Sequence, residues 1–473
     1  MADYRPVTAE IVEALRGIAG ERYVLYDDPE RMAAYAHDEV AGEEYAHMPD
    51  VVVKPDSALE IADILRLANR ERIPVTPRGA GSGLSGGAVP VYGGILLSLE
   101  RMNRILEIDR ENMVAVVEPG VITNEINEQV QQYGLFYAGY PMSVESCFVG
   151  GNVAENAGGG RAIKYGVTGR YVLGLEVVLP TGEIVQLGGK RVKDVTGYDL
   201  VRLMVGSEGT LGIFSQIILR LLPLPAARAV LLVPFADVPT AIAAVPEIMT
   251  LGHLLPASVE FMDRLSVATA YDFLGESPPH PDIGAMLLIE VDGYSQEQVE
   301  AEFGAVAELC LEAGALDVYV GNTADTERRM WRPRQNVAEA FKAISPVQSL
   351  EDVVVPLAQI PALVQELERI SAQYGVLIPC YGHAGDGNLH ATPVKRPEMS
   401  MEEWQATLPE LLSELYSAVA RLGGTISGEH GVGSKRAAYL PLVMDPVLIS
   451  LQRRIKQAFD PLNILNPGKI FPG

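Results

Sequence analysis

Cysteine is scarce in this chain, which has three cysteines in 473 residues. Cys147, Cys310 and Cys380 lie far apart in the sequence and form no C-x-x-C spacing. This pattern argues against a disulfide framework and against an iron–sulfur cluster held by this chain, and it is typical of a reducing compartment. We therefore expect a cytoplasmic protein.

Positively charged residues are also few. The chain has 37 Lys and Arg residues and 61 Asp and Glu residues, which gives a net charge of −24. Nucleic-acid binding needs clustered cations, so we expect no nucleic-acid partner. The chain lacks any apolar run near the ~20 residues that a membrane helix needs. Residues 1–17 carry charges throughout and lack the apolar core of a signal peptide. We expect a chain that does not span a membrane, and attachment at the inner membrane through a partner stays open.

Apolar residues make up 48% of the chain, enough for large cores. At about 150 residues per domain, the length predicts two to four domains. An amphipathic helix is predicted over residues 8–19. A strand at 51–55, a helix capped by Ser57 and Glu60 and a strand at 73–77 follow as a β-α-β unit.

A glycine-rich stretch, GAGSGLSGG at residues 79–87, comes next and contains a formal G-x-G-x-x-G match. In a Rossmann fold a helix begins within these glycines, so that its amides face a pyrophosphate. Here Pro90, Gly93 and Gly94 oppose a helix, and residues 95–99 have the pattern of a strand. The Rossmann interpretation therefore fails, although successive glycine amides can still form an anion-binding nest.

Two more glycine-rich stretches follow, at residues 148–166 and 205–225, and the latter is predicted to be a glycine loop followed by a strand. All three glycine-rich segments are predicted to be loops between short strands. Three such loops predict an α+β domain around an extended ligand that carries phosphates. The alternative, that the glycines only form tight turns, stays open at this point. From residue 226 onward, strand-then-helix segments predict a second α+β domain with an antiparallel sheet, placed as a cap.

Histidine is rare, yet His383 and His390 flank one polar loop, and His430 follows Glu429 in a second glycine-flanked loop. Two imidazoles and one carboxylate are a recurring set of divalent-metal ligands. In an extended backbone, the adjacent side chains of Glu429 and His430 would point in opposite directions, so that one could bind a metal and the other a reactant. A purely structural role for these histidines remains the alternative.

Two arginines in MWRPRQN, Arg332 and Arg334, offer forks that match a substrate carboxylate. From spacing alone, a surface salt bridge is the favoured interpretation for both.

Six stretches occur in a fixed order: PRGAGSGLSGGAVP (77–90), GGNVAENAGG (150–159), GSEGTLG (206–212), HAGDGNLH (383–390), SGEHGVG (427–433) and NPGK (466–469). Together they resemble the FAD-linked 2-hydroxyacid dehydrogenases, which include D-lactate dehydrogenases, D-2-hydroxyglutarate dehydrogenases and the FAD-binding subunit of bacterial glycolate oxidase. The resemblance covers nearly the whole chain and implies an α+β fold. Residues 1–225 would form a FAD-binding domain of the vanillyl-alcohol oxidase and p-cresol methylhydroxylase type, with an N-terminal helical segment. Residues 226–427 would form the substrate-binding cap, and residues 428–473 would return to the FAD domain.

The resemblance also implies the residues that bind FAD. Residues 79–87 would wrap the pyrophosphate, residues 150–159 would run along the flavin, and Asn466 would return to the cofactor. Many relatives carry Pro-Asp-Pro-Ser where this chain has YPMSVES at 140–146. The complete expected set is Pro77, Arg78, Gly79, Ala80, Gly81, Ser82, Gly83, Leu84, Gly86, Gly87, Pro141, Ser143, Gly150, Gly151, Asn152, Ala154, Asn156, Ala157, Gly158, Gly159, Glu208, Gly212, Ile213 and Asn466.

By the same matching, His383, His390 and Glu429 correspond to the ligands of a divalent metal, zinc in the first place and otherwise manganese or iron. His430 matches the catalytic base. Arg334, in the W-x-x-R pattern, matches the arginine that binds the substrate carboxylate, which replaces the salt-bridge interpretation for that residue.

No histidine lies between His47 and His253, so the residue most often used for a covalent flavin link is missing from this region. We expect noncovalent FAD, with Cys147 as a buried side chain.

The implied reaction is the oxidation of a small D-2-hydroxy acid, of the lactate or glycolate type, to the 2-oxo acid, with hydride transfer to flavin N5. The chain has no haem or cluster motif, so an external acceptor would take the electrons: a quinone, a cytochrome, an electron-transfer flavoprotein, an iron–sulfur subunit or dioxygen. Residues 345–356 hold no Lys or Arg, which favours a monocarboxylate. Two alternative functions stay open: a FAD-bearing oxidase subunit that is inactive alone, and a metal-dependent hydrolase. A homodimer also stays open.

Overall fold

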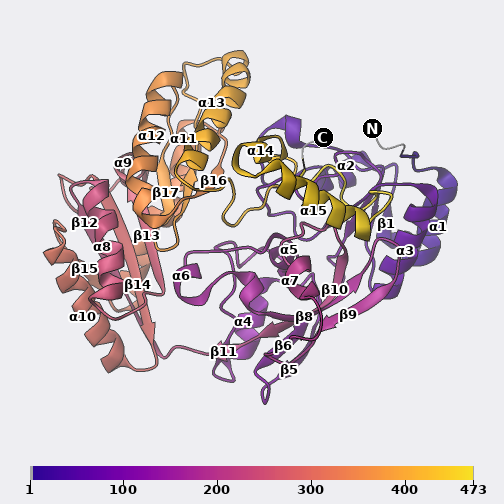
Figure 1. The fold of residues 1–473 in the computed structure, drawn as a ribbon, viewed down its shortest axis with the longest axis horizontal. Coiled ribbons are helices and arrows are strands. Elements are labelled where there is room, and N and C mark those ends of the chain that lie inside the picture. The colour runs from indigo at the N-terminus through magenta and orange to yellow at the C-terminus, as the bar shows by residue number, and fades with distance from the viewer. Residues whose placement is uncertain (1–3, 472–473) are drawn as a thin grey trace. The chain divides into compact units, whose positions relative to one another are not determined.

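The computed structural model of the chain describes residues 4–471, and its contacts divide them into two compact units (Figure 1). The first consists of the residues up to Gly158, Val167–Pro223 and the residues from Glu429 onward, and is called the outer unit for its place in the sequence. The second consists of Gly159–Gly166 and Leu224–Gly428, and is called the central unit, also for its place in the sequence.

The outer unit begins with the predicted β-α-β arrangement. Strands β2 (Val51–Val53) and β3 (Val75–Arg78) both run parallel to β4 (Ile95–Ser98), which lies between them. Helix α3 (Ala58–Glu71) connects β2 to β3, and its N-cap Ser57 accepts a hydrogen bond of 3.2 Å from the Glu60 amide. The apolar stripe of α3 packs into a core with α1 (Ala9–Ala19), as the helical periodicity predicts.

A five-stranded antiparallel sheet is a second part of this unit. Its order is β5 (Ile105–Asp109), β6 (Val114–Val117), β10 (Ile213–Arg220), β8 (Val172–Val178) and β9 (Ile184–Gly188). Helix α15 (Pro446–Phe459) precedes the closing NPGK segment. An isolated parallel bridge between Val75 and Leu465 attaches that segment to strand β3.

The first glycine-rich stretch is a loop, as predicted, but the other two differ from the expectation of loops between strands. Residues 149–155 form helix α5 (Val149–Glu155), and the third loop follows helix α7 (Leu200–Met204) before it enters β10. The glycines allow α5 to lie close to a neighbouring turn, because a Cβ atom on Gly150 would lie 2.5 Å from Cβ of Pro119. The helix ends at Asn156, which has a left-handed φ of 55°.

The central unit is built on a seven-stranded antiparallel sheet with flanking helices, in agreement with the predicted pattern. The strand order is β15 (Tyr319–Gly321), β12 (Ala227–Phe235), β14 (Ala285–Gly293), β13 (Ser258–Asp263), β17 (Cys380–His383), β18 (Asn388–Ala391) and β16 (Glu351–Val354). Helices α8 (Val238–Thr250) and α10 (Gln296–Glu312) lie along β12 and β14 (Figure 1). Helices α9 (Arg264–Leu274) and α11 (Ala324–Ile344) pack on a face that carries Leu232, Met262 and Leu288.

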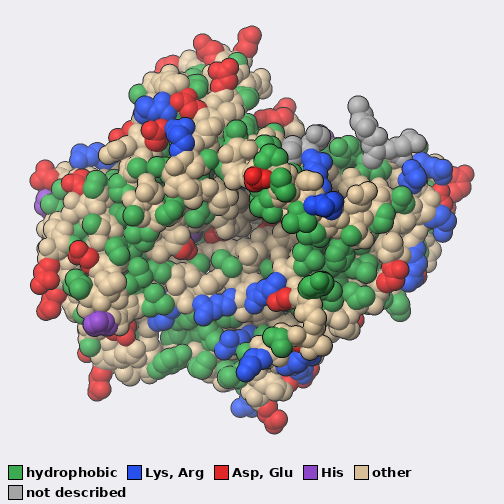
Figure 2. All heavy atoms as spheres, viewed as in Figure 1, with side chains coloured by type: hydrophobic (Ala, Val, Ile, Leu, Met, Phe, Trp, Pro, Cys, Tyr) green, Lys and Arg blue, Asp and Glu red, His purple; other side chains and the backbone are tan. Residues whose placement is uncertain are grey.

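Within residues 4–471, no helix is long and apolar enough to cross a membrane. On the face drawn in Figure 2, Asp and Glu side chains are scattered over the surface and do not gather into one patch.

Candidate functional site

A cavity of about 80 Å³ lies in the outer unit, next to the glycine-rich segments. Strands β3 and β10, helix α5 and the closing segment all contribute to its lining. The expected FAD-binding residues that line it are Pro77, Arg78, Gly79, Gly87, Gly150, Gly151, Ala154, Glu208, Gly212, Ile213 and Asn466. Five residues outside the expected set also line the cavity: Ala88, Leu99, Glu155, Gly209 and Phe214. Of these, Glu155 lies in the segment 150–159 that is expected to run along the flavin.

The other expected residues lie outside this lining. They are Ala80, Gly81, Ser82, Gly83, Leu84, Gly86, Pro141, Ser143, Asn152, Asn156, Ala157, Gly158 and Gly159. Asn152 has an internal role, since its Nδ2 donates to Thr123 Oγ1 at 2.8 Å and to the buried Cys147 Sγ at 3.3 Å.

Arg78 uses its guanidinium within the protein. Nη1 donates to the His37 carbonyl at 2.7 Å, and Nη2 donates to the Ala34 carbonyl at 3.1 Å. The Arg78 side chain therefore holds the segment that precedes β2 in place. Only the backbone of Arg78 is suited to contact a ligand in the cavity.

The cavity fits a ligand that approaches the backbone closely. A Cβ atom on Gly151 would meet no protein atom within 4 Å, and the φ angle of Gly151 is not positive. Neither packing nor backbone conformation therefore requires glycine at this helical position. A cofactor in contact with the main chain explains the missing side chain, which is how glycine-rich segments bind the phosphates of nucleotide cofactors.

Two acidic side chains face the same cavity. Glu208 accepts hydrogen bonds from the amides of Val432 at 2.8 Å and Gly433 at 2.7 Å. Burial raises the pKa of Glu208, and burial together with the nearby Glu208 charge raises the pKa of Glu155 well above its ordinary value. Burial also lowers the pKa of the neighbouring Lys469 to about 8. Since raised pKa values favour the neutral carboxyl groups, these acids repel a pyrophosphate less than two free carboxylates would.

Glu429 and His430 do not point in opposite directions, so that prediction was wrong. Residues 428–430 form a bend instead of an extended strand, and His430 Nε2 lies 3.5 Å from Glu429 Oε1. Both side chains are largely buried, with exposed fractions of 10% for Glu429 and 18% for His430.

In the central unit, one face of the sheet carries a polar row across four strands. In the strand register Glu260 of β13 pairs with His383 of β17, which in turn pairs with Asn388 of β18. One step along, His390 of β18 pairs with Asp352 of β16. Cross-strand partners lie on the same face of a sheet. The register therefore brings together side chains that are 130 residues apart in the chain.

The two histidines of this row are buried and adjacent. The ring centroids of His383 and His390 lie 5.5 Å apart at an interplanar angle of 82°. His383 Nδ1 contacts Glu260 Oε1 at 2.5 Å. A carboxylate on one ring nitrogen is the usual support of a metal-binding histidine, because it sets the tautomer and orients the other nitrogen. The donor set therefore fits a divalent cation.

Arg334 reaches the same carboxylate from helix α11, where its Nε donates to Glu260 Oε2 at 2.7 Å. Its guanidinium also lies over the Tyr381 ring, 5.2 Å from the ring centroid. Burial alone would raise the pKa of Glu260, but His383 and Arg334 hold it below its ordinary value. Arg332 by contrast is 45% exposed and pairs with Glu276 at 2.9 Å, so the surface salt bridge is the correct interpretation for that residue.

Sequence reasoning missed Glu260 and Asp352. Asp352 is fully buried, with Oδ1 2.6 Å from Asn388 Nδ2 and Oδ2 2.9 Å from both Ser427 Oγ and the Gly428 amide. Two acids directly before a run of valines, as in EDVVV (351–355), are the signal that could have found Asp352, because an acid in a buried strand needs a partner.

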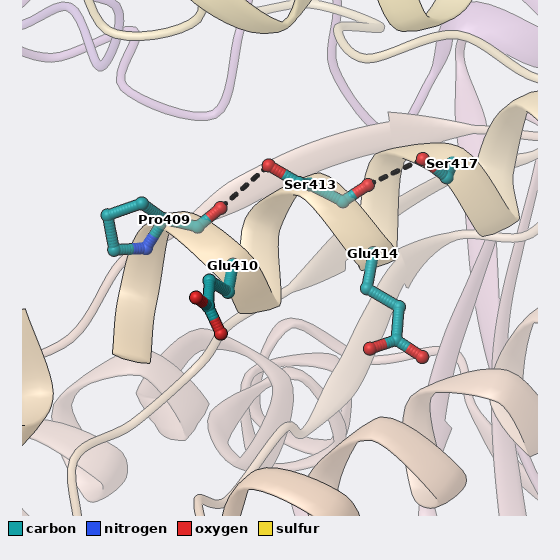
Figure 3. A pocket seen from close by; sticks show the side chains of 5 residues that line it. All are labelled: Pro409, Glu410, Ser413, Glu414 and Ser417. Carbon is teal, nitrogen blue, oxygen red and sulfur yellow. Dashed lines mark hydrogen bonds between the residues drawn. The ribbon is translucent and has the colours of Figure 1, made fainter. Parts of the chain in front are cut away.

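A second, shallow hollow lies on helix α13 (Met401–Arg421) and is lined by Pro409, Glu410, Ser413, Glu414 and Ser417 (Figure 3). Ser413 and Ser417 both donate to carbonyl oxygens of their own helix, at 2.8 and 2.7 Å (Figure 3). The lining hydroxyls are thus used locally, and the hollow has no convergent polar groups.

Comparison with known proteins gives two family matches. Residues 49–188 match a family model described as a FAD binding domain, and residues 224–470 match one described as the C-terminal domain of FAD linked oxidases. Glycolate oxidase subunit GlcD of Bacillus subtilis is 39% identical over 98% of this chain and 97% of that protein. A D-lactate dehydrogenase of Anaerostipes hadrus is 39% identical over 99% of this chain and 98% of that protein.

Two solved structures share the fold. p-Cresol methylhydroxylase with bound substrate aligns with a TM-score of 0.80 at 20% identity, over 99% of this chain and 98% of that chain. The 4-ethylphenol oxidase of Gulosibacter chungangensis aligns with a TM-score of 0.78 at 21% identity, over 100% of this chain and 99% of that chain. The predicted fold type is confirmed.

Proposed function

Because the chain belongs to the FAD-linked oxidase family, we propose that it oxidises a small D-2-hydroxy acid to the corresponding 2-oxo acid. FAD is its cofactor, as predicted. The observation that supports this substrate class is the buried polar row of the central unit, with two imidazoles and an arginine supported by one carboxylate. Such a polar row does not stabilise the core as apolar side chains would, because every buried polar group needs a hydrogen-bond partner. It suits a substrate that combines a carboxylate with an adjacent hydroxyl.

His383, His390 and Glu429 are the proposed ligands of a divalent cation, with zinc, manganese and iron as the candidates. When bound, the cation would act as a Lewis acid that lowers the pKa of the substrate hydroxyl, and FAD would accept the hydride from C2. His430 would take the hydroxyl proton as a general base, a role that is typically worth about 10²–10⁴-fold in rate.

Arg334 would hold the substrate carboxylate through its guanidinium, which fixes the acid in one orientation. The segment 345–356 has no Lys or Arg that could bind a second carboxylate. Ser349 Oγ lies 2.5 Å from Glu351 Oε1, so this buried corner already holds an acidic side chain. A monocarboxylate of the lactate or glycolate type is the proposed substrate.

The reduced flavin would pass its electrons to an external acceptor. Cys147, Cys310 and Cys380 are all buried and separate, which does not fit a cluster held by this chain. A relative is named as a subunit of glycolate oxidase, which favours a second candidate function: a FAD-bearing subunit that needs a partner for turnover. The metal-dependent hydrolase is not favoured, because it leaves the FAD-binding domain unexplained.

The test is the visible spectrum of the purified protein before and after anaerobic addition of D-lactate, glycolate or D-2-hydroxyglutarate. We expect a yellow protein that D-lactate or glycolate bleaches. Bleaching by D-2-hydroxyglutarate alone would contradict the monocarboxylate assignment. If none of the acids bleaches the flavin, even with Mn²⁺ or Zn²⁺ present, the hydroxy-acid proposal is wrong for the isolated chain.

A further inference from the structure

One carboxylate in the central unit contacts two residues with separate proposed roles. Glu260 is 1% exposed, and its Oε1 and Oε2 atoms contact His383 Nδ1 at 2.5 Å and Arg334 Nε at 2.7 Å. We propose that Glu260 is a positioning residue that fixes His383 for cation binding and Arg334 for binding the substrate carboxylate. This inference rests on the proposed function, because it takes the roles of those two residues from it.

The contact with His383 selects one ring nitrogen for the cation. A carboxylate beside Nδ1 favours the tautomer in which Nδ1 carries the proton, so that Nε2 presents its lone pair. The register supports the same orientation, since Glu260 and His383 are direct cross-strand partners on β13 and β17. Loss of the carboxylate would leave the ring free to adopt the other tautomer.

The contact with Arg334 leaves the ends of the guanidinium for a substrate. Glu260 is bound through Nε, whereas a bidentate grip on a carboxylate uses two nitrogens of the fork. The Tyr381 ring also contacts the guanidinium and further limits its movement. Because Arg334 is 6% exposed, an unpaired charge here would be strongly unfavourable without Glu260.

The main chain at Gly160 lies close against this carboxylate. A Cβ atom at residue 160 would lie 2.3 Å from Glu260 Oε1 and 3.4 Å from His383 Nδ1. Gly160 and Glu260 both belong to the central unit. Gly160 is the third glycine of the GGG run at 158–160. The absence of a side chain there lets the main chain pass directly over the Glu260–His383 contact.

A matched control exists on the same face of the sheet. Glu290 of β14 is 4% exposed and pairs with Arg161 at 2.7 Å, but its ion pair involves neither His383 nor Arg334. Glu260→Gln and Glu290→Gln thus remove one buried carboxylate charge each from neighbouring strands. A merely structural ion pair would respond similarly at both positions.

The experiment measures Mn²⁺ affinity without substrate, and KM and kcat for D-lactate and glycolate, in the FAD-loaded wild type and both variants. We expect Glu260→Gln to weaken Mn²⁺ binding by about 10–100-fold, the usual effect of losing a carboxylate behind a ligating histidine. KM should rise at least tenfold in the same variant. Glu290→Gln should leave Mn²⁺ affinity and KM within about twofold of wild type, because a carboxylate that does not contact a metal ligand does not orient one.

Equal effects of the two substitutions would overturn the positioning role. If Glu260→Gln does not fold, Gly160→Ala replaces it: the carboxylate is kept but displaced, so Mn²⁺ binding should still weaken by at least tenfold. Unchanged Mn²⁺ binding in that variant would also overturn the inference. Mn²⁺ binding is measured without substrate. A wild type whose Mn²⁺ affinity depends on Glu260 but that oxidises no hydroxy acid would therefore contradict the proposed function alone.

Discussion

The side-chain Nδ2 of Asn466 donates a hydrogen bond of 2.7 Å to the Glu208 carbonyl oxygen. The same nitrogen donates to the Gly87 carbonyl at 3.0 Å, so one amide ties the first and third glycine-rich segments to the closing NPGK segment. Asn466 has a φ of 43°, in the left-handed region that asparagine tolerates better than most residues. The shape of the cavity thus depends on the conformation and the side chain of one residue.

Asn466→Ala should weaken FAD binding by about tenfold or more, because two hydrogen bonds of about 1 kcal/mol each are lost and alanine is strained at positive φ. Asn466→Gly is the matched variant, since it keeps the backbone conformation and loses only the hydrogen bonds. A fluorescence titration of the apoprotein with FAD measures both. Affinities equal to wild type would show that the tie between the segments has no effect on the cofactor.

Gly151→Ala should separate ligand binding from folding. The residue lies in helix α5, and its Cβ would meet no protein atom. The apoprotein should therefore keep its stability or gain up to about 1 kcal/mol in free energy of unfolding, as alanine favours helices. FAD affinity should fall by at least tenfold, because the methyl group would occupy the space of the cofactor.

Gly304→Ala in helix α10 is the control for this prediction, because its Cβ also meets nothing within 4 Å and it lies outside the cavity. It should affect stability like Gly151→Ala and leave FAD affinity unchanged. Equal FAD affinity in both variants would remove Gly151 from the cofactor site.

Local patterns predicted much of this fold. The stripe of α3, the glycine loop at 79–87 and the alternating strand and helix after residue 226 all depend on residues close together in the chain. The prediction failed at residues 149–155, where two glycines favoured a loop. There, Gly150 and Gly151 lie in a helix, and Gly150 allows that helix to lie close to Pro119.

The candidate site was predictable only as separate motifs. His383 and His390 stood out because two histidines in a polar loop are unusual. Glu260 is 123 residues away from His383, so nothing local connects the two residues. Only the pairing of β13 with β17 brings the two together. The bend at 428–430, which turns Glu429 and His430 toward each other, likewise has no signature beyond its glycines.

His430→Asn should lower kcat for the hydroxy acid by about 10²–10⁴-fold, because asparagine cannot take the hydroxyl proton. The FAD spectrum should stay as in wild type, since His430 does not line the cofactor cavity. His253→Asn is the control: this histidine is exposed and has a φ of 51°, a conformation that asparagine also accepts. Stopped-flow reduction of the flavin measures the step directly. Wild-type reduction rates in His430→Asn would assign the base to another residue.

The pH dependence of stability should be visible at Asp263, at the end of β13. Burial raises the pKa of Asp263 from 3.8 to about 6, even though its carboxylate accepts hydrogen bonds from the Ser266 amide at 2.7 Å and the Cys380 amide at 3.0 Å. In this range the folded state keeps a proton that the unfolded state has lost. The stabilising effect of that proton is therefore present at low pH and disappears as pH rises through 6, a change of about 3 kcal/mol.

Asp263→Asn removes this titration. The free energy of unfolding of wild type minus that of the variant should therefore fall by about 2 kcal/mol between pH 4 and pH 7. Urea unfolding of the apoprotein, followed by tryptophan fluorescence, measures this free energy for the central unit. Both tryptophans, Trp331 and Trp404, lie in that unit with Asp263. A difference that does not change with pH for Asp263→Asn would mean that the carboxyl group ionises as easily in the folded protein as in the unfolded chain.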